Sequence, residues 1–134
     1  PSILLAAMFT RDKYHIRGTE VIRSLKGMKD RMVPAPVIHE LFQLATVRMN
    51  YGRATDMVEV VEHGGFDICA LTDIDRIRMI SIMRQYASSA FDYTDAAIMA
   101  LSERLNITQV YTFDRRDFTV FRPKHCDYLE LLPT

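Results

Sequence analysis

Three acidic residues stand where an expected strand gives way to a helix or a loop. Glu40 follows a strand expected at residues 32–35. Asp95 lies in the first turn of an expected helix, and Asp114 follows a strand expected at 108–112. In one parallel sheet these carboxylates would lie beyond the same edge and would repel one another unless a cation binds. Oxygen ligands favour Mg²⁺ or Mn²⁺, which can activate water and stabilise the charge of an in-line phosphoryl displacement.

Each acid also has an ordinary structural interpretation. A single Asp or Glu is most often a solvated surface charge. Acids in the first turn of a helix are favoured simply because they face the positive end of the helix dipole. From the residues alone, a metal site and a set of surface charges both remain open.

The segment 112–118 has the densest mixture of charged and aromatic residues. Its structural interpretation is an exposed turn with local ion pairs, each contributing about 0–1 kcal/mol. In the functional interpretation Asp114 is a metal ligand, and Asp117 is a further ligand or a helix cap. Four nearby basic residues would then supply phosphate-binding charge, and the planar fork of arginine suits phosphate better than lysine does: Arg115, Arg116, Arg122 and Lys124.

Apolar spacing places these residues on alternating strands and helices. Strands are expected at 32–35, 66–71, 108–112 and 128–132. Helices are expected at 2–9, 15–28, 36–51, 54–63, 73–86 and 95–105. The alternation predicts βαβ units, and therefore an α/β fold with a mostly parallel sheet and helices on both faces.

Two of these helices carry more specific expectations. Thr94 is expected to cap the helix that contains Asp95, since threonine is a favourable N-cap residue. In the helix at 73–86, Ile74, Ile77 and Ile80 are expected to face the core.

Length and composition exclude several classes of protein. The chain of 134 residues is 49% hydrophobic, has 17 basic and 17 acidic residues, and contains no repeat or linker, so a single globular domain is expected. Two cysteines are too few for a disulfide scaffold. No apolar run reaches the roughly 20 residues of a membrane span, and no secretory signal is present, so we expect a cytoplasmic protein.

The order of motifs resembles a known family. The run FDYTDAAIMALSERL at 91–105, followed by TFDRRDF at 112–118 and Arg122-Pro123, closely resembles the C-terminal half of PIN-domain ribonucleases, most of all the VapC-type toxins of bacterial toxin–antitoxin pairs. PAPVIHEL at 34–41 is similar to the family's glutamate-bearing segment, and SILLAA at 2–7 is similar to its start after an Asp-x-Ser motif. The resemblance implies a PIN-like α/β/α sandwich with a mostly parallel central sheet.

The resemblance also implies a site and an activity. The family's metal-binding catalytic acids match three residues: Glu40, Asp95 and Asp114. Asp117 matches a variable position that is sometimes acidic, and Ser2 and Thr112 match site-supporting hydroxyls. The implied activity is that of a Mg²⁺- or Mn²⁺-dependent endoribonuclease that leaves 5′-phosphate and 3′-hydroxyl ends. The implied partners are an RNA substrate, an antitoxin protein and a second copy of the chain, with no membrane.

The sequence departs from the family's pattern at its start. The family's first acid would directly precede Pro1, and the central first strand would come with it. We therefore expect residues 1–134 to form one PIN-like domain without its N-terminal strand, the missing piece lying upstream. If the chain does begin at Pro1, the alternative is a catalytically silent module that binds RNA or protein. Cleavage of DNA by the same chemistry is a third possibility.

Overall fold

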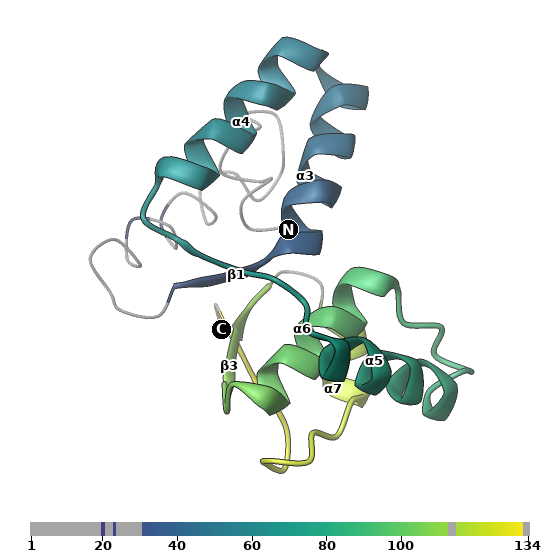
Figure 1. The fold of residues 1–134 in the computed structure, drawn as a ribbon. Coiled ribbons are helices and arrows are strands. Elements are labelled where there is room, and N and C mark those ends of the chain that lie inside the picture. The colour runs from purple at the N-terminus through teal and green to yellow at the C-terminus, as the bar shows by residue number, and fades with distance from the viewer. Residues whose placement is uncertain (1–19, 21–22, 24–30, 113–114, 133–134) are drawn as a thin grey trace. The chain divides into compact units, whose positions relative to one another are not determined.

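The computed structural model describes residues 20, 23, 31–112 and 115–132 (Figure 1). The chain forms two compact units, unit 1 at Pro1–Cys69 and unit 2 at Ala70–Thr134. The helices expected at 2–9 and 15–28 lie outside the described residues, except for Glu20 and Arg23, as do Ser2 and Asp114.

The described part of unit 1, residues 31–69, contains two short strands that pair in parallel and two helices. Its described elements are β1 (Met32–Pro34), α3 (Ala35–Arg48), α4 (Tyr51–His63) and β2 (Asp67–Cys69). Val33 of β1 is in register with Ile68 of β2. The side chain of Asn50 caps α4 by accepting a hydrogen bond of 2.8 Å from the backbone N–H of Arg53, so α3 ends and α4 begins within a tight hairpin.

The helices of unit 1 bury one face each. Because side chains three or four residues apart share a helix face, the apolar spacing in α3 and α4 produces two matching stripes. Among the described residues of the unit, the buried apolar ones are Val33, Val37, Leu41, Ala45, Ala54, Met57 and Val61.

Three helices and a second parallel pair of strands lie in the described part of unit 2. Its described elements are α5 (Asp73–Gln85), α6 (Tyr93–Arg104), β3 (Gln109–Tyr111), α7 (Arg116–Val120) and β4 (Glu130–Leu132). Val110 is in register with Leu131. The small residues Ala96, Ala97 and Ala100 are buried, so α6 can approach its neighbours closely. Phe118 and Phe121 fill the core beside them.

The expected alternation of strands and helices is confirmed in the described part of the chain, and both strand pairs are parallel. One helix was not expected: α7 forms where the sequence predicted an exposed turn. None of the helices in the described part combines the length and apolar character of a membrane span.

The predicted orientation of α5 is wrong. Ile74, Ile77 and Ile80 are exposed, whereas Met79 and Ile82 are buried with Asp75. Both faces of this helix contain large apolar residues, so spacing alone could not decide between them. The buried carboxylate of Asp75 accepts a hydrogen bond of 2.7 Å from Arg104, and this contact with α6 selects the inward face.

Candidate functional site

Asp95 occupies a buried position in the first turn of α6. Asp95 as a whole is only 8% exposed, and its neighbours Thr94, Ala96 and Ala97 are also buried. The N-cap is Asp92, whose carboxylate accepts a hydrogen bond of 2.8 Å from the backbone N–H of Asp95. The prediction that Thr94 caps this helix is therefore wrong, because Thr94 already lies within the helix and packs in the core.

Asp92 is the residue that the sequence reasoning missed. It stands three residues before Asp95, the spacing at which an N-cap oxygen reaches a backbone N–H of the first turn. That spacing is visible in the sequence, but Thr94 is a second residue type that can cap a helix. The structure excludes Thr94 as the cap because Thr94 is buried within the helix.

Thr112 lies at the same end of unit 2 as Asp95. Four residues join α6 to β3, with Asn106 in the left-handed region at φ 54°, so the helix and the strand run in opposite directions. The first turn of α6 therefore lies beside the carboxyl end of β3. Thr112 follows that end directly, is 8% exposed, and donates its backbone N–H to the Leu132 carbonyl at 2.7 Å.

Asp117 adds a second nearly buried acid to unit 2. It lies in the first turn of α7, is 9% exposed, and accepts a hydrogen bond of 3.4 Å from Arg116. Because α7 packs against α6 and begins four residues after Thr112, Asp117 follows the same end of β3. Asp114 lies outside the described residues.

Glu40 belongs to the other unit. It lies in the second turn of α3 and is half-buried beside the core residue Leu41. The structure therefore brings Asp95, Thr112 and Asp117 into one unit, while the convergence of Glu40 with them stays a prediction. In the part of the chain that is described, no three His, Cys, Asp or Glu side chains form a group that could hold a metal ion.

The donors present in unit 2 fit a hard divalent cation. Two nearly buried acids, Asp95 and Asp117, offer carboxylate oxygens as ligands. Oxygen donors of this kind suit Mg²⁺ or Mn²⁺ better than metals that prefer sulfur or nitrogen.

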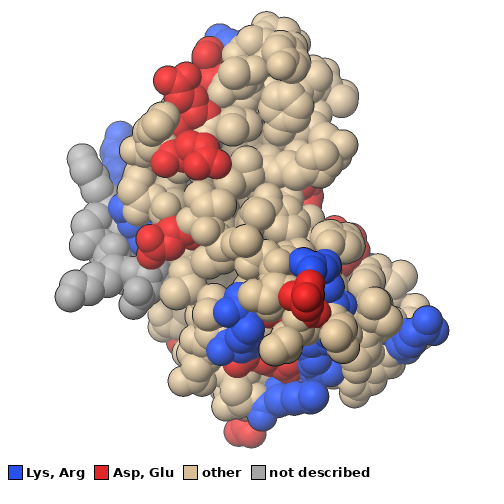
Figure 2. Space-filling model, in the orientation of Figure 1, with Lys and Arg blue, Asp and Glu red and all other residues tan. Residues whose placement is uncertain are grey.

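The four predicted RNA-binding residues are all exposed. Arg115 donates to the Leu131 carbonyl at 3.2 Å, and Arg122 donates to the Thr119 carbonyl at 2.6 Å. The Arg116 side chain is 81% exposed. The backbone N–H of Lys124 donates a hydrogen bond to the carboxylate of Glu103. Figure 2 shows basic side chains interspersed with acidic ones over the part of the surface where unit 2 lies in Figure 1.

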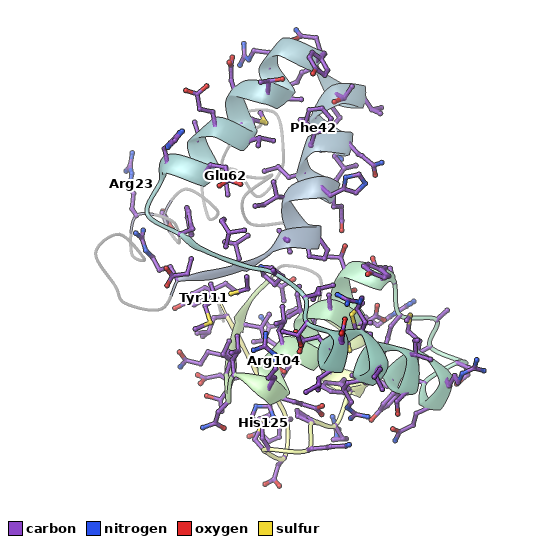
Figure 3. All side chains as sticks on the ribbon, viewed as in Figure 1. Arg23, Phe42, Glu62, Arg104, Tyr111 and His125 are labelled. Carbon is purple, nitrogen blue, oxygen red and sulfur yellow. The ribbon has the colours of Figure 1, made fainter. Side chains whose placement is uncertain are left out.

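At the opposite end of α6, one acid of α5 and one acid of α6 are each paired with an arginine of the other helix. Asp75 pairs with Arg104, labelled in Figure 3, at 2.7 Å, and Glu103 accepts two hydrogen bonds from Arg78, at 2.6 and 3.0 Å. Burial alone would raise the pKa of the Asp75 carboxyl, but hydrogen bonds from Arg104 and Thr72 outweigh it and hold that pKa below its usual range.

Glu103 and Arg78 stabilise each other's charged forms. Burial opposes the ionisation of Glu103, but the hydrogen bonds from Arg78 and from the backbone N–H of Lys124 lower its pKa. The hydrogen bonding between Arg78 and Glu103 in turn raises the pKa of Arg78. These pairs join α5 to α6 and hold the helix that carries Asp95 in place.

Comparison with known proteins supports the resemblance seen in the sequence. Residues 2–122 match the PIN domain. Among solved structures the chain is similar to VapC20 of Mycobacterium tuberculosis, a toxin that cleaves the sarcin–ricin loop, with a TM-score of 0.81 and 17% identity over 93% of this chain and 94% of that one. A comparison with curated proteins finds no match. The fold is the α/β PIN fold with parallel strands.

Proposed function

The chain belongs to the PIN domain family, and on this basis we propose that it is a metal-dependent endoribonuclease that acts as a toxin. The observation that carries the proposal is the placement of Asp95. Asp95 is nearly buried, lies in the first turn of a largely buried helix, and lies beside the end of β3 that Thr112 follows. A buried acid at the carboxyl end of a parallel strand is where an α/β fold binds its ligand.

Four acids of the chain would hold Mg²⁺ or Mn²⁺: Glu40, Asp95, Asp114 and Asp117. Bound there, the ion would supply positive charge to the scissile phosphate and make water a stronger nucleophile. Ser2 and Thr112 would support the site through their hydroxyls. Asp92 holds the backbone of Asp95 and thereby the direction in which its carboxylate leaves the helix.

The exposed basic residues would bind the RNA backbone. Arg116 and Lys124 have charged groups that extend from the surface, while Arg115 and Arg122 are tethered to main-chain carbonyls and present a fixed charge. Phosphate contacts of this type position a nucleic acid without reading its sequence.

The proposed partners follow from the family. VapC20 cleaves the sarcin–ricin loop, and we propose a structured RNA as the substrate of this chain, cleaved to 5′-phosphate and 3′-hydroxyl ends. A small antitoxin protein would block the site, and a second copy of the chain would form a homodimer. Action in the cytoplasm and a single domain over 1–134 remain predictions.

The test is hydrolysis of a structured RNA by the purified chain, with Mn²⁺ and with EDTA. Cleavage is expected with the metal and not with the chelator. The double variant Asp95→Asn plus Asp114→Asn is expected to lose cleavage, and metal-dependent cleavage that survives in it contradicts this site. A calorimetric titration with Mn²⁺ that shows no carboxylate-dependent binding favours the silent RNA- or protein-binding module, and competing DNA and RNA substrates distinguish the nuclease classes.

A further inference from the structure

One aromatic side chain stays exposed in the first turn of α6. Tyr93 is 53% exposed, whereas the four residues that follow it, 94–97, are all buried. This turn lies beside the carboxyl end of β3, so Tyr93 is at the same end of unit 2 as Asp95 and Thr112. Its ring therefore offers an apolar surface at the end of the unit that carries the proposed metal ligand.

A fixed turn holds the backbone that leads into Tyr93. Ala90 is in the left-handed region at φ 52°, and its backbone N–H donates to the Tyr86 carbonyl at 3.2 Å. Phe91 is 6% exposed and stacks on the ring of Tyr86, with the centroids 5.1 Å apart. Asp92 then caps α6. Because a tyrosine ring has only two side-chain torsions, a ligand that packs on it restricts little further motion.

The ring of Tyr86 also anchors a basic residue. Phe121 contacts this ring edge to face, with the centroids 5.8 Å apart. The backbone N–H of the next residue, Arg122, donates to the Tyr86 hydroxyl at 3.0 Å. We call Tyr86, Phe91 and Phe121 the Tyr86 cluster. The exposed residues Tyr93 and Arg122 both extend from segments that this cluster holds.

An exposed tyrosine and an exposed arginine on one fixed frame suit single-stranded RNA. Proteins that bind single strands combine basic side chains, which contact phosphates, with aromatic rings, on which bases stack. We propose that an unpaired base of the RNA stacks on the ring of Tyr93 while Arg122 contacts the backbone of the same strand. The inference rests on the proposed ribonuclease function, and it adds a residue that contacts the substrate without binding the metal.

The first experiment removes the ring. Tyr93→Leu keeps an apolar side chain, and we expect the affinity for an RNA hairpin with a single-stranded loop to fall about 10-fold, since loss of one base–aromatic stack weakens binding by roughly 5- to 150-fold. Tyr93→Phe keeps the ring and should bind like wild type. Fluorescence anisotropy in EDTA measures binding without cleavage, and circular dichroism confirms folding.

Tyr128→Leu is the matched control for loss of an exposed tyrosine. Tyr128 is 67% exposed, and it precedes β4 at the amino end of the parallel pair that β3 and β4 form. It therefore lies at the other end of these strands from Thr112. Its substitution is expected to leave RNA affinity unchanged.

The second experiment separates stacking from a structural role of Tyr93. The same RNA hairpin is made with an abasic site at one loop position at a time, and we expect one position to weaken binding to the wild-type chain about 10-fold. That abasic RNA should bind Tyr93→Leu no more weakly than the intact RNA does, because both changes remove one shared contact. In cleavage assays Tyr93→Leu should raise KM about 10-fold and leave kcat nearly unchanged.

The outcomes separate this proposal from the nuclease proposal. Unchanged RNA affinity in Tyr93→Leu, or an additional loss at every abasic position, overturns the stacking role and leaves the nuclease site intact. A wild-type chain that shows the abasic effect but cleaves no RNA contradicts the nuclease site alone, and one that binds no RNA overturns both. If Tyr93→Leu does not fold, photo-crosslinking of the wild-type chain to a 5-iodouridine in the loop replaces it, and crosslinked peptides without Tyr93 overturn the proposal.

Discussion

Acids lie near both ends of α6, in different surroundings. At the C-terminal end, Glu103 pairs with Arg78, and Arg104 pairs with Asp75, so each negative charge has an arginine beside it. At the N-terminal end, two acids, Asp92 and Asp95, share one helical turn. Acids that lie close together repel one another, and the positive end of the helix dipole favours them at this position. The arginine pairs thus assign Asp75 and Glu103 to the packing of α5 against α6, whereas Asp95 is a candidate ligand because of its place in the first turn of α6.

The largest expected effect is at the N-terminal end. Asp95→Asn preserves the shape of the side chain but removes a ligand charge, and we expect RNA cleavage to fall about 1000-fold, since several kcal/mol of transition-state stabilisation depend on the metal. Asp92→Asn is the matched control, because asparagine caps a helix as well as aspartate does. Single-turnover cleavage with saturating Mn²⁺ measures both. An equal loss of RNA cleavage in the two variants would contradict the assignment of Asp92 as the helix cap and Asp95 as the metal ligand.

A substitution at the C-terminal end of α6 is expected to lower the stability of the fold without changing the rate of RNA cleavage. Glu103→Ala leaves Arg78 largely buried without its partner, and we expect the free energy of unfolding to fall by about 2–4 kcal/mol. Urea unfolding measures the loss. Cleavage per folded molecule should stay within about twofold of wild type. Glu62→Ala, at an exposed position in α4, is the control and should shift stability by less than about 0.5 kcal/mol.

The same comparison predicts how stability depends on pH. The folded-state pKa values of Asp75 and Glu103 lie below their unfolded values, so both carboxylates bind protons less readily when folded. Their contribution is present above about pH 4.3, the unfolded value for glutamate, and is lost as pH falls through the lower folded values. Melting temperatures between pH 7 and pH 2 should drop less steeply in Glu103→Gln than in wild type. If the melting temperatures of Glu103→Gln and wild type fall in parallel as the pH is lowered, the Glu103–Arg78 pair does not govern acid unfolding.

The smallest expected effect is at the basic surface. Arg116→Ala should weaken RNA binding about two- to threefold and reduce the salt slope by about 0.7, the value of one phosphate contact to a single strand. Arg53→Ala, an exposed residue of α4, is the control for a general change in net charge. Filter binding from 50 to 300 mM salt tests both, and an unchanged slope in Arg116→Ala removes that contact from the RNA-binding surface.

Several features of the fold were predictable because they depend on local patterning. The strands near Val33 and Val110 and the helices between them follow from apolar spacing, and the position of Asp95 in a first helical turn follows from the motif around it. The α7 helix was missed because five residues carry too little periodicity to separate a short helix from a turn.

By itself the sequence determined the order of the elements, the parallel α/β class and the acids at their ends, because each of these follows from residue type and spacing along the chain. Only the tertiary structure decided which side of α5 faces inward, because both sides are apolar and the choice depends on Arg104, 29 residues from Asp75. It likewise decided that Asp92 and not Thr94 caps α6, because both residues can form a cap but only one lies outside the core. Interactions between residues distant in sequence select among arrangements that local chemistry leaves equally favourable.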